Sequence, residues 1–247
     1  MTRLNLTFIG SGDAFSSGGR LQSGILIESQ AHGLLLDCGA TLLVGLQRCG
    51  ITTDQIDSIA ISHLHGDHFA GIPFLLLDAL FVRKRTKPLH IFGPAGTKDR
   101  LAEACKVLYP GALEGPFPFA VEYHVLDHSK AIAHESIQFS TFAVSHSQHS
   151  AACAIRVDIE GRTISYSGDT RWDNNLIELA RGSDLFICEC CNYDEPSPAH
   201  LDYLTLKQHL VDLDSVRIIL AHTGPMIDKN LQHIDLEIAY DGLQLQL

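Results

Sequence analysis

The sequence predicts a layered α/β domain, on three observations. Segments of strand length alternate with segments of helical spacing along all 247 residues, which is typical of helices packed outside sheets. Hydrophobic residues make up 45% of the chain and charged residues 19%, an ordinary globular balance. No Pro- or Ser-rich linker and no repeat interrupts the chain. We therefore expect residues 1–247 to form a single domain.

The first half of the chain alternates apolar runs with turn residues. Apolar runs of strand length occupy residues 4–9, 25–27, 34–36, 58–62 and 89–92. Helical spacing occupies residues 41–49, 74–82 and 98–108, and Pro73 lies near the start of the second of these helices. Polar residues and Gly33 separate the runs at 25–27 and 34–36, which predicts a hairpin.

The second half repeats this alternation without repeating the sequence. Strands are predicted at residues 120–126, 137–144, 152–159, 163–167, 184–188 and 216–220. Helices are predicted at residues 175–180 and 204–210. The tail alternates in residues 234–240 and 243–247 around Asp241-Gly242, which predicts a second hairpin.

Charge and terminal sequence limit the possible partners. The net charge is −11, whereas proteins that hold long nucleic acids usually have a basic face. The one basic run, Arg83-Lys84-Arg85-Thr86-Lys87, is interpreted as a solvated helix end. No signal-peptide pattern and no apolar stretch of about 18 residues is found, so we expect a cytoplasmic protein without a membrane partner.

The cysteines fit the same compartment. They number seven, are scattered and form no CxxC pair, so no disulfide framework is predicted. Cys188, Cys190 and Cys191 surround Glu189 and are interpreted as buried thiols at a strand end.

The strongest functional signal is the hexapeptide His63-Leu64-His65-Gly66-Asp67-His68, which follows a predicted buried strand. In an extended segment, side chains two residues apart point the same way, so His63 and His65 can reach one metal ion. Gly66 permits a sharp turn, which would aim Asp67 and His68 at a second ion nearby. Imidazole and carboxylate ligands suit zinc. The hexapeptide therefore predicts a metal site.

This hexapeptide has the HxHxDH form of the metallo-β-lactamase superfamily, which the chain resembles further downstream. The matching positions are His146 in Val-Ser-His-Ser, Asp169 in Ser-Gly-Asp-Thr and His222 in Leu-Ala-His-Thr, each at the end of a predicted strand. The lone histidine has a competitor in His149. The resemblance implies the metallo-β-lactamase fold, an αβ/βα four-layer sandwich with metals at one edge of two packed sheets.

The resemblance also implies a complete ligand set for two zinc ions per chain. One ion would be held by His63, His65 and His146, the other by Asp67, His68 and His222, and Asp169 would bridge them. The same ligands suit manganese or iron, and sequence does not decide between them.

Further residues resemble the ribonuclease Z-like branch of this superfamily. They are Phe8-Ile-Gly-Ser-Gly-Asp-Ala-Phe, Arg20, Ser23-Gly24, Leu36-Asp-Cys-Gly, Gly93-Pro94 and Ala239-Tyr-Asp-Gly. That branch uses a glutamate after a strand and a later histidine as the proton donor to the leaving group. The matching positions are Glu189 in Cys-Glu-Cys-Cys and His200 in Ala-His-Leu.

The chain also departs from the longer tRNA 3′-processing enzymes of this branch. Between His68 and His146 it has ordinary helix and strand segments in place of a Gly- and Pro-rich arm that clamps tRNA. Ala40 follows Gly39 where an acidic residue is usual, and Leu-Asp follows His200 where Ser-Thr is favoured. Short, armless members of the branch include cyclic-nucleotide phosphodiesterases, which this chain resembles more closely.

The expected activity is therefore hydrolysis of a small or cyclic nucleotide phosphodiester. A hydroxide shared by the two metals would attack phosphorus, and Asp67 would orient it. His200 would protonate the leaving oxygen while Glu189 fixes its tautomer. By family habit we also expect a homodimer.

Three alternatives stay open at this point. The first is a ribonuclease Z-like RNA endonuclease that acts as a dimer and contacts RNA through residues 83–87. The second is a thioesterase or lactonase of glyoxalase II type, against which the His200–Glu189 pair argues, because those substrates need no strong proton donor. The third is a scaffold or sensor without activity, against which the complete ligand set argues.

Overall fold

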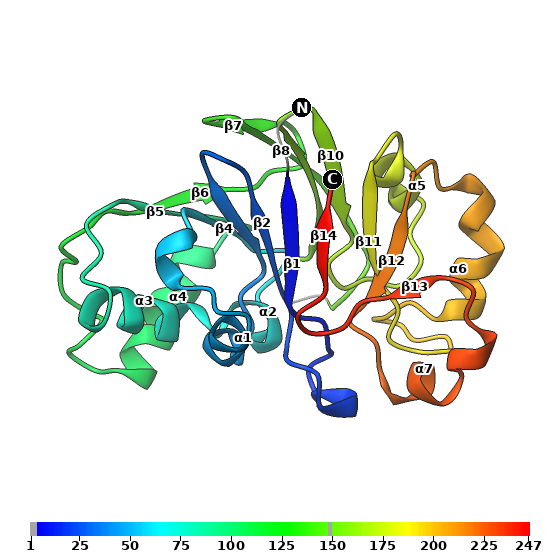
Figure 1. Ribbon diagram of the computed structural model, residues 1–247, viewed down its shortest axis with the longest axis horizontal. Helices are drawn as coiled ribbons and strands as arrows, with labels where there is room; N and C mark the ends of the chain where they lie inside the picture. Colours follow the sequence, from blue (N-terminus) through cyan, green and yellow to red (C-terminus); the bar gives the residue numbers. More distant parts are fainter. Residues whose placement is uncertain (1–3, 148–149) are drawn as a thin grey trace.

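Two seven-stranded sheets form in residues 4–147 and 150–247, the part of the chain that this computed structural model describes (Figure 1). In spatial order, the first sheet contains β14 (Gln244–Gln246), β1 (Asn5–Gly10), β2 (Gly24–Glu28), β3 (Gly33–Leu36), β4 (Ser58–Ala60), β5 (Leu89–Gly93) and β6 (Val121–Val125). The second sheet contains β13 (Glu237–Ile238), β12 (Ile218–Ala221), β11 (Leu185–Glu189), β10 (Arg162–Tyr166), β9 (Cys153–Ile159), β8 (Ile137–Ala143) and β7 (Ile132–His134).

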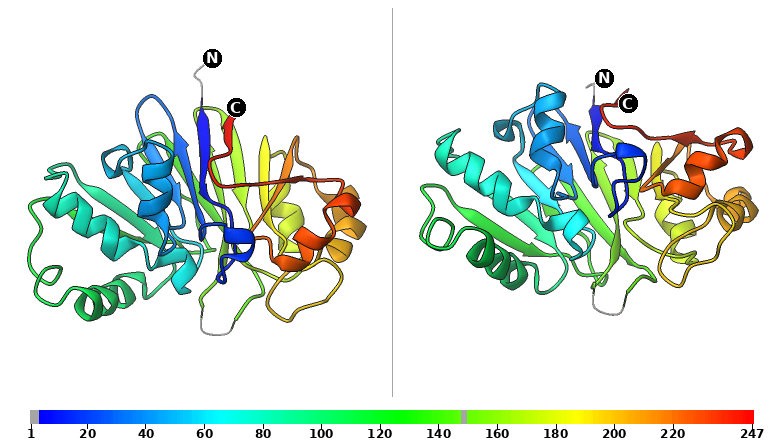
Figure 2. Two further views of the ribbon diagram at one scale, coloured as in Figure 1. Left: turned by 60° about the horizontal axis from the view of Figure 1, so that its bottom comes forward. Right: turned by 90° about the horizontal axis from the view of Figure 1, so that it is seen from below.

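Helices cover the outer faces of both sheets (Figure 2). The first sheet is accompanied by α1 (Leu42–Arg48), α2 (Gly66–Phe69), α3 (Ile72–Phe81) and α4 (Thr97–Leu108). The second sheet is accompanied by α5 (Asn175–Ala180), α6 (Tyr203–His209) and α7 (Pro225–Lys229). Short 3-10 turns occur at Ser17–Gly19, Thr53–Gln55, Leu210–Asp212 and Leu231–His233. The predicted αβ/βα four-layer sandwich is confirmed.

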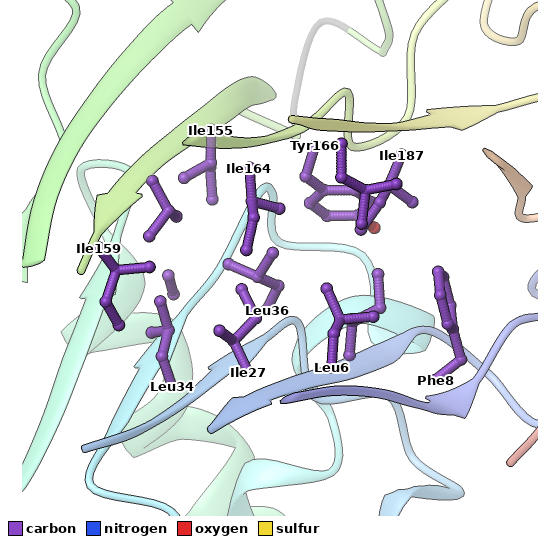
Figure 3. Packing of buried hydrophobic residues seen from close by; sticks show 14 of the residues in the cluster. Leu6, Phe8, Ile27, Leu34, Leu36, Ile155, Ile159, Ile164, Tyr166 and Ile187 are labelled. Atoms are coloured by element: carbon purple, nitrogen blue, oxygen red, sulfur yellow. The ribbon is translucent and has the colours of Figure 1, made fainter. Parts of the chain in front are cut away.

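The two sheets bury their facing side chains against each other (Figure 3). The first sheet contributes Leu6, Phe8, Ile27, Leu34 and Leu36, and the second contributes Ile155, Ile159, Ile164, Tyr166 and Ile187. Full burial of an aliphatic side chain contributes about 1.5–3 kcal/mol to stability. Central strands such as β4 and β11 are buried on both faces, because a sheet covers one face and helices cover the other.

Strand direction brings several loops to one edge of the second sheet. Strands β10, β11 and β12 pair in parallel, while β9 is antiparallel to both β8 and β10. The carboxyl ends of β8, β10, β11 and β12 therefore lie at the same edge. Residues that follow these strands can meet there, even where they are far apart in sequence.

The predicted hairpin at residues 25–36 is confirmed, since β2 and β3 pair antiparallel. The predicted tail hairpin is wrong. β13 pairs with β12 in the second sheet, whereas β14 pairs with β1 in the first sheet. Asp241 lies between them and accepts hydrogen bonds from Ser11 N, Ser11 Oγ and Leu21 N at 2.8–3.0 Å. These contacts to the N-terminal loop direct the tail across both sheets. The short strand β7 was not predicted.

The basic run is not entirely the solvated helix end that was expected. Arg85 is buried, and its guanidinium donates to the carbonyls of Thr53, Ile56, Lys87 and Pro88. Arg83 and Lys84 are exposed. Arg85 therefore joins a loop to the end of the helix and is unavailable to a ligand. No helix in the described residues is long and apolar enough to cross a membrane.

Candidate metal centre

The predicted ligands follow strand ends, as the sequence indicated. His63 lies three residues after the end of β4, and His146 lies three residues after the end of β8. Asp169 follows β10 by three residues, and His222 directly follows β12. The first sheet therefore contributes the hexapeptide, and one edge of the second sheet contributes the other ligands.

The structure brings His63, His65 and His146 together as one group. One ring nitrogen of each lies within 4.8 Å of the others. His146 Nε2 is 3.1 Å from His65 Nδ1, and the ring centroids in this group are 4.7–4.9 Å apart. Three imidazoles at this spacing can share one divalent ion.

A second group contains Asp67, His68, Asp169 and His222, whose ligand atoms also lie within 4.8 Å of one another. Asp67 Oδ2 is 3.2 Å from both His68 Nε2 and His222 Nε2. Asp169 Oδ1 is 3.2 Å from His68 Nε2. All seven residues predicted as ligands thus lie in two adjacent groups.

Asp169 is placed between the two groups. Its Oδ2 atom lies 3.8 Å from His63 Nε2 and 3.9 Å from His146 Nε2 in the first group, and 3.4 Å from His222 Nε2 in the second. A carboxylate in this position can contact two ions at once, which is the predicted bridging role.

The donor atoms fit a cation. His63 Nε2, His68 Nε2 and Asp169 Oδ1 are buried, with no hydrogen-bond partner among the described residues. Burial, together with the charge of His68, holds the pKa of His63 well below its usual value, so this ring keeps a free lone pair.

The pKa values of the second group also indicate that its carboxylates favour a positive charge nearby. Burial by itself would lower the pKa values of His68 and His222, but the Asp169 carboxylate raises both well above normal. The pKa of Asp169 is correspondingly held low, although burial opposes this. Divalent metal ions bind such sites by displacing protons from the ligands. The residues present therefore fit divalent metal ions.

Asp37 supports this group from behind and was not singled out as a site residue from sequence. It is fully buried and accepts hydrogen bonds at 2.7 Å from His68 Nδ1, Ser62 N, Ser62 Oγ and Tyr166 OH. The bond to His68 Nδ1 leaves Nε2 directed at Asp67 and Asp169. The signal was present in Leu36-Asp-Cys-Gly, which pointed to the branch and not to this role.

The chain turns at Gly66, from an extended His65 into a helix, but this turn does not use the conformational freedom of a glycine. Gly66 begins the short helix α2 without a positive φ, and an added Cβ would meet only Ala70 Cβ, at 3.8 Å. The start of α2 directs Asp67 and His68. The glycine that the site requires is Gly168, which has a φ of +56°. A Cβ atom at this position would lie only 2.8 Å from Ser62 Cβ, so no larger residue fits. Asp37 and His222 also adopt positive φ, of 56° and 52°.

Glu189 and His200 form the contact that was predicted for them. Glu189 is the last residue of β11 and is 1% exposed. Its Oε1 atom is 3.1 Å from His200 Nδ1, and its oxygens also accept from Thr170 N and Leu201 N. His200 Nδ1 is 3.8 Å from Asp169 Oδ2, so the pair borders the metal ligands.

The protonation of His200 follows from this contact. Burial lowers the pKa of His200, but the hydrogen bond and charge of Glu189 outweigh it, and the pKa lies above its usual value. Burial acts on Glu189 in the opposite sense and raises its pKa. The geometry supports a proton shared by the two residues, with the ring as its principal holder, since Glu189 accepts two backbone hydrogen bonds as well.

The cysteines near Glu189 divide into two kinds. Cys188 and Cys190 are fully buried and match the expectation. Cys191 is only half-buried, and its sulfur lies within 4.8 Å of ligand atoms of His200 and His222. Burial raises the pKa of Cys191, so its thiol stays protonated near neutral pH. His149, the competitor for the role of His146, lies outside the described residues.

Comparison with known proteins gives matches over almost the whole chain. The family model described as anti-Pycsar protein Apyc1 matches residues 4–237. The anti-Pycsar protein Apyc1 of Bacillus phage 010DV004 is 27% identical over 238 residues, which cover 90% of this chain and 89% of that protein. A ribonuclease Z of Ignicoccus hospitalis is 27% identical over 233 residues, which cover 76% of each chain.

A solved structure agrees with the fold. The metallo-β-lactamase fold protein YhfI from Bacillus subtilis has a TM-score of 0.81 at 20% sequence identity, and the match covers 100% of both chains. The metallo-β-lactamase fold and the ribonuclease Z-like branch are therefore confirmed. Since the family model spans all but the ends of the chain, this protein belongs to the anti-Pycsar protein Apyc1 family.

Proposed function

We propose that this chain, a metal-dependent phosphoester hydrolase, acts on a small or cyclic nucleotide phosphodiester at a two-metal centre. The observation that carries this proposal is the contact between His200 and Glu189 beside Asp169. A phosphodiester releases an alkoxide, which needs a proton as it leaves. A histidine held beside the ligand groups meets that need.

The two ligand groups indicate which residues would hold each metal ion. His63, His65 and His146 would hold one ion, Asp67, His68 and His222 the other, and Asp169 both. When bound, two divalent ions neutralise charge on the phosphoryl oxygens and make hydroxide available near neutral pH. Zinc is the proposed metal, because five imidazoles and two carboxylates make up the donors of these groups.

The roles of the chain's own residues follow from their contacts. Glu189 accepts the proton on His200 Nδ1 as a hydrogen bond, so Nε2 is the atom that can give a proton to the leaving oxygen. Asp67 is held ionised, since the hydrogen bond with His222 and the nearby His68 ring lower its pKa although burial opposes them. An ionised Asp67 can accept a hydrogen bond from the attacking water and orient it.

Three features support a small substrate over a long RNA. Between His68 and His146 the chain forms α3, β5, α4, β6, β7 and β8, with no clamping arm in that stretch. The net charge is −11. Arg85 in the basic run is buried against carbonyl groups, which removes it from the proposed RNA contact. Homodimer formation stays a prediction.

A ribonuclease Z-like activity on RNA is the second candidate, because the relative from Ignicoccus hospitalis is named ribonuclease Z. RNA cleavage also releases an alkoxide and would use the same proton donor. A thioesterase would leave the His200–Glu189 pair without a task, because a thiolate leaves readily without a proton.

The test compares two classes of leaving group in zinc-loaded protein. Cyclic nucleotides release an alkoxide, whereas bis(p-nitrophenyl) phosphate releases a stable phenolate that needs little protonation. We expect His200→Ala to lower turnover of the cyclic nucleotide by about 10²–10⁴-fold. Turnover of bis(p-nitrophenyl) phosphate should fall much less. Asp169→Ala should abolish both, because it removes the residue between the two ligand groups.

Matched controls separate chemistry from structure. His233→Ala removes an exposed histidine outside the ligand groups and should leave both rates unchanged. An equal loss on both substrates in His200→Ala would rule out proton donation by His200. Wild-type protein that binds zinc at both ligand groups but hydrolyses no phosphodiester would overturn the proposed function in favour of thioesters or lactones. Faster cleavage of RNA, with a steep salt dependence, would favour the second candidate.

A further inference from the structure

A second cluster of histidines shares no residue with the two ligand groups of the candidate metal centre. His90 is on β5, His124 on β6 and His134 on β7. β6 is the edge strand of the first sheet and β7 is the edge strand of the second (Figure 1). The cluster therefore lies where the open edges of the two sheets meet.

Strand register explains why the three rings converge. His90 pairs with Glu122, and Phe92 pairs with His124, so these side chains share one face of the first sheet. His134 approaches that face from β7, with ring centroids 4.2 Å from His90 and 5.6 Å from His124. Two sheets thus supply three rings to one point.

The nitrogen atoms have the spacing of metal ligands. One ring nitrogen from each of the three histidines lies within 4.8 Å of the others. His90 Nδ1 is 3.2 Å from His124 Nε2. In a tetrahedral zinc site with zinc–nitrogen distances of about 2.0–2.1 Å, two nitrogens are separated by about 3.3 Å. The nitrogen of His134, within 4.8 Å of the other two, would move to this separation when an ion binds.

The protonation and hydrogen bonding of these rings also suit a metal. Burial lowers the pKa values of His90, His124 and His134, so the rings are neutral near pH 7 and keep lone pairs. His134 Nε2 is buried without a hydrogen-bond partner among the described residues. A buried polar atom without a partner is costly, and a bound ion would satisfy it.

A neighbouring histidine shows the contrast. His32 is also close to His134, with ring centroids 5.9 Å apart. Both of its nitrogens are already engaged, Nδ1 with Glu135 at 2.9 Å and Nε2 with Ser58 Oγ at 2.8 Å. His32 is therefore a supporting residue and not a ligand of this cluster.

We propose that His90, His124 and His134 form an additional divalent-metal site, suited to zinc, that joins the edge strands of the two sheets. Three imidazoles leave a fourth position for water or a carboxylate. Glu122 is half-exposed, and its Oε2 atom is 3.6 Å from His90 Nδ1, so it is placed to approach as the fourth ligand. Imidazole ligands also suit copper and nickel, which prefer square-planar over tetrahedral geometry.

The bound ion would act on the structure and not on the substrate. It would connect β5 and β6 of the first sheet to β7 of the second through their side chains. An ion that binds the folded chain and not the unfolded chain raises the free energy of unfolding. This site is independent of the proposed catalytic centre.

The experiment measures zinc per chain in wild type, His124→Gln and His134→Gln. Metal-depleted protein is reconstituted with zinc, dialysed and analysed by mass spectrometry of the element. We expect each variant to bind one ion fewer than wild type, with an unchanged rate on bis(p-nitrophenyl) phosphate. His128→Gln is the matched control, since His128 is an exposed histidine between β6 and β7.

The outcomes are distinguishable. Equal zinc content in wild type and both variants overturns the proposal, and so does a variant that loses phosphodiesterase activity together with its ion. Because a variant could misfold, zinc-soaked crystals of wild type provide a second measurement. An anomalous scattering peak between the three rings supports the site, and its absence overturns it. Failure of the proposed function would show instead as missing turnover, with the one-ion difference intact.

Discussion

Replacement of Asp37 by asparagine tests how the fold controls one metal ligand. Asp37 Oδ1 accepts from Ser62 N, and Oδ2 accepts from Ser62 Oγ, Tyr166 OH and His68 Nδ1. In Asp37→Asn the amide oxygen must stay opposite Ser62 N, which can only donate. The amide nitrogen then occupies the position of Oδ2 and faces His68 Nδ1 as a donor.

The consequences differ among the three groups on Oδ2. The hydroxyls of Ser62 and Tyr166 can rotate and accept from the new amide. His68 can accept at Nδ1 only by moving its proton to Nε2, the atom that faces Asp67 and Asp169. The variant therefore removes a metal ligand by changing the tautomer. Loss of such a supporting contact lowers metal affinity by about 10–100-fold.

The loss of stability expected in Asp37→Asn can be matched by a control variant, Tyr166→Phe. One hydrogen bond to a charged acceptor contributes about 1.5–3 kcal/mol, so Asp37→Asn should lower the free energy of unfolding by about that amount. Tyr166→Phe removes a different hydrogen bond to the same oxygen and should cost a similar amount. The carboxylate and its bond to His68 remain in Tyr166→Phe, so metal affinity should be unchanged.

The assay combines zinc titration against a chelating dye with urea unfolding of the metal-free proteins. We expect weakened binding of one ion in Asp37→Asn and normal binding in Tyr166→Phe, with comparable losses of stability. Excess zinc should restore part of the activity of Asp37→Asn. Unchanged zinc affinity in Asp37→Asn, or equal weakening in both variants, would refute the control of His68 by Asp37.

Three further predictions concern single contacts. Burial lowers the pKa of His200 and Glu189 raises it more, so the protonated ring should persist above the usual histidine range, and kcat/KM on a cyclic nucleotide should fall as pH rises through that raised pKa. Glu189→Gln should shift this alkaline fall in kcat/KM to lower pH. A pH profile that Glu189→Gln leaves unchanged would exclude the pair as proton donor. Arg85→Ala should lower the free energy of unfolding, measured by urea denaturation, by about 3 kcal/mol or more, because buried hydrogen bonds from a charged donor are lost. Replacement of the exposed Lys84 by alanine should change it by less than about 0.5 kcal/mol. A small effect of Arg85→Ala would mean that water replaces the guanidinium. Gly66→Ala should retain zinc content and activity, since φ is ordinary and a Cβ has space, and a loss of zinc would restore the turn role that was first predicted.

Much of the fold was accessible from local sequence. Apolar runs with turn residues predicted β2 and β3 as a hairpin, and the alternation of strands and helices predicted the layers. Local patterns also placed the strand ends, and the resemblance to the metallo-β-lactamase superfamily identified the ligands that follow them. The tail shows the limit. Asp241-Gly242 has the composition of a hairpin turn, but β13 and β14 find different partner sheets.

The site divides in the same way. The sequence by itself determined which side chains could bind metal, since the HxHxDH spacing in residues 63–68 is local and the chemistry of imidazole and carboxylate is intrinsic. Only the tertiary structure decided that Asp37, 31 residues before His68, fixes its tautomer. Only packing of the two sheets brought His134 to His90 and His124. Such contacts depend on strand register and on which edges meet, and no short window of sequence records either.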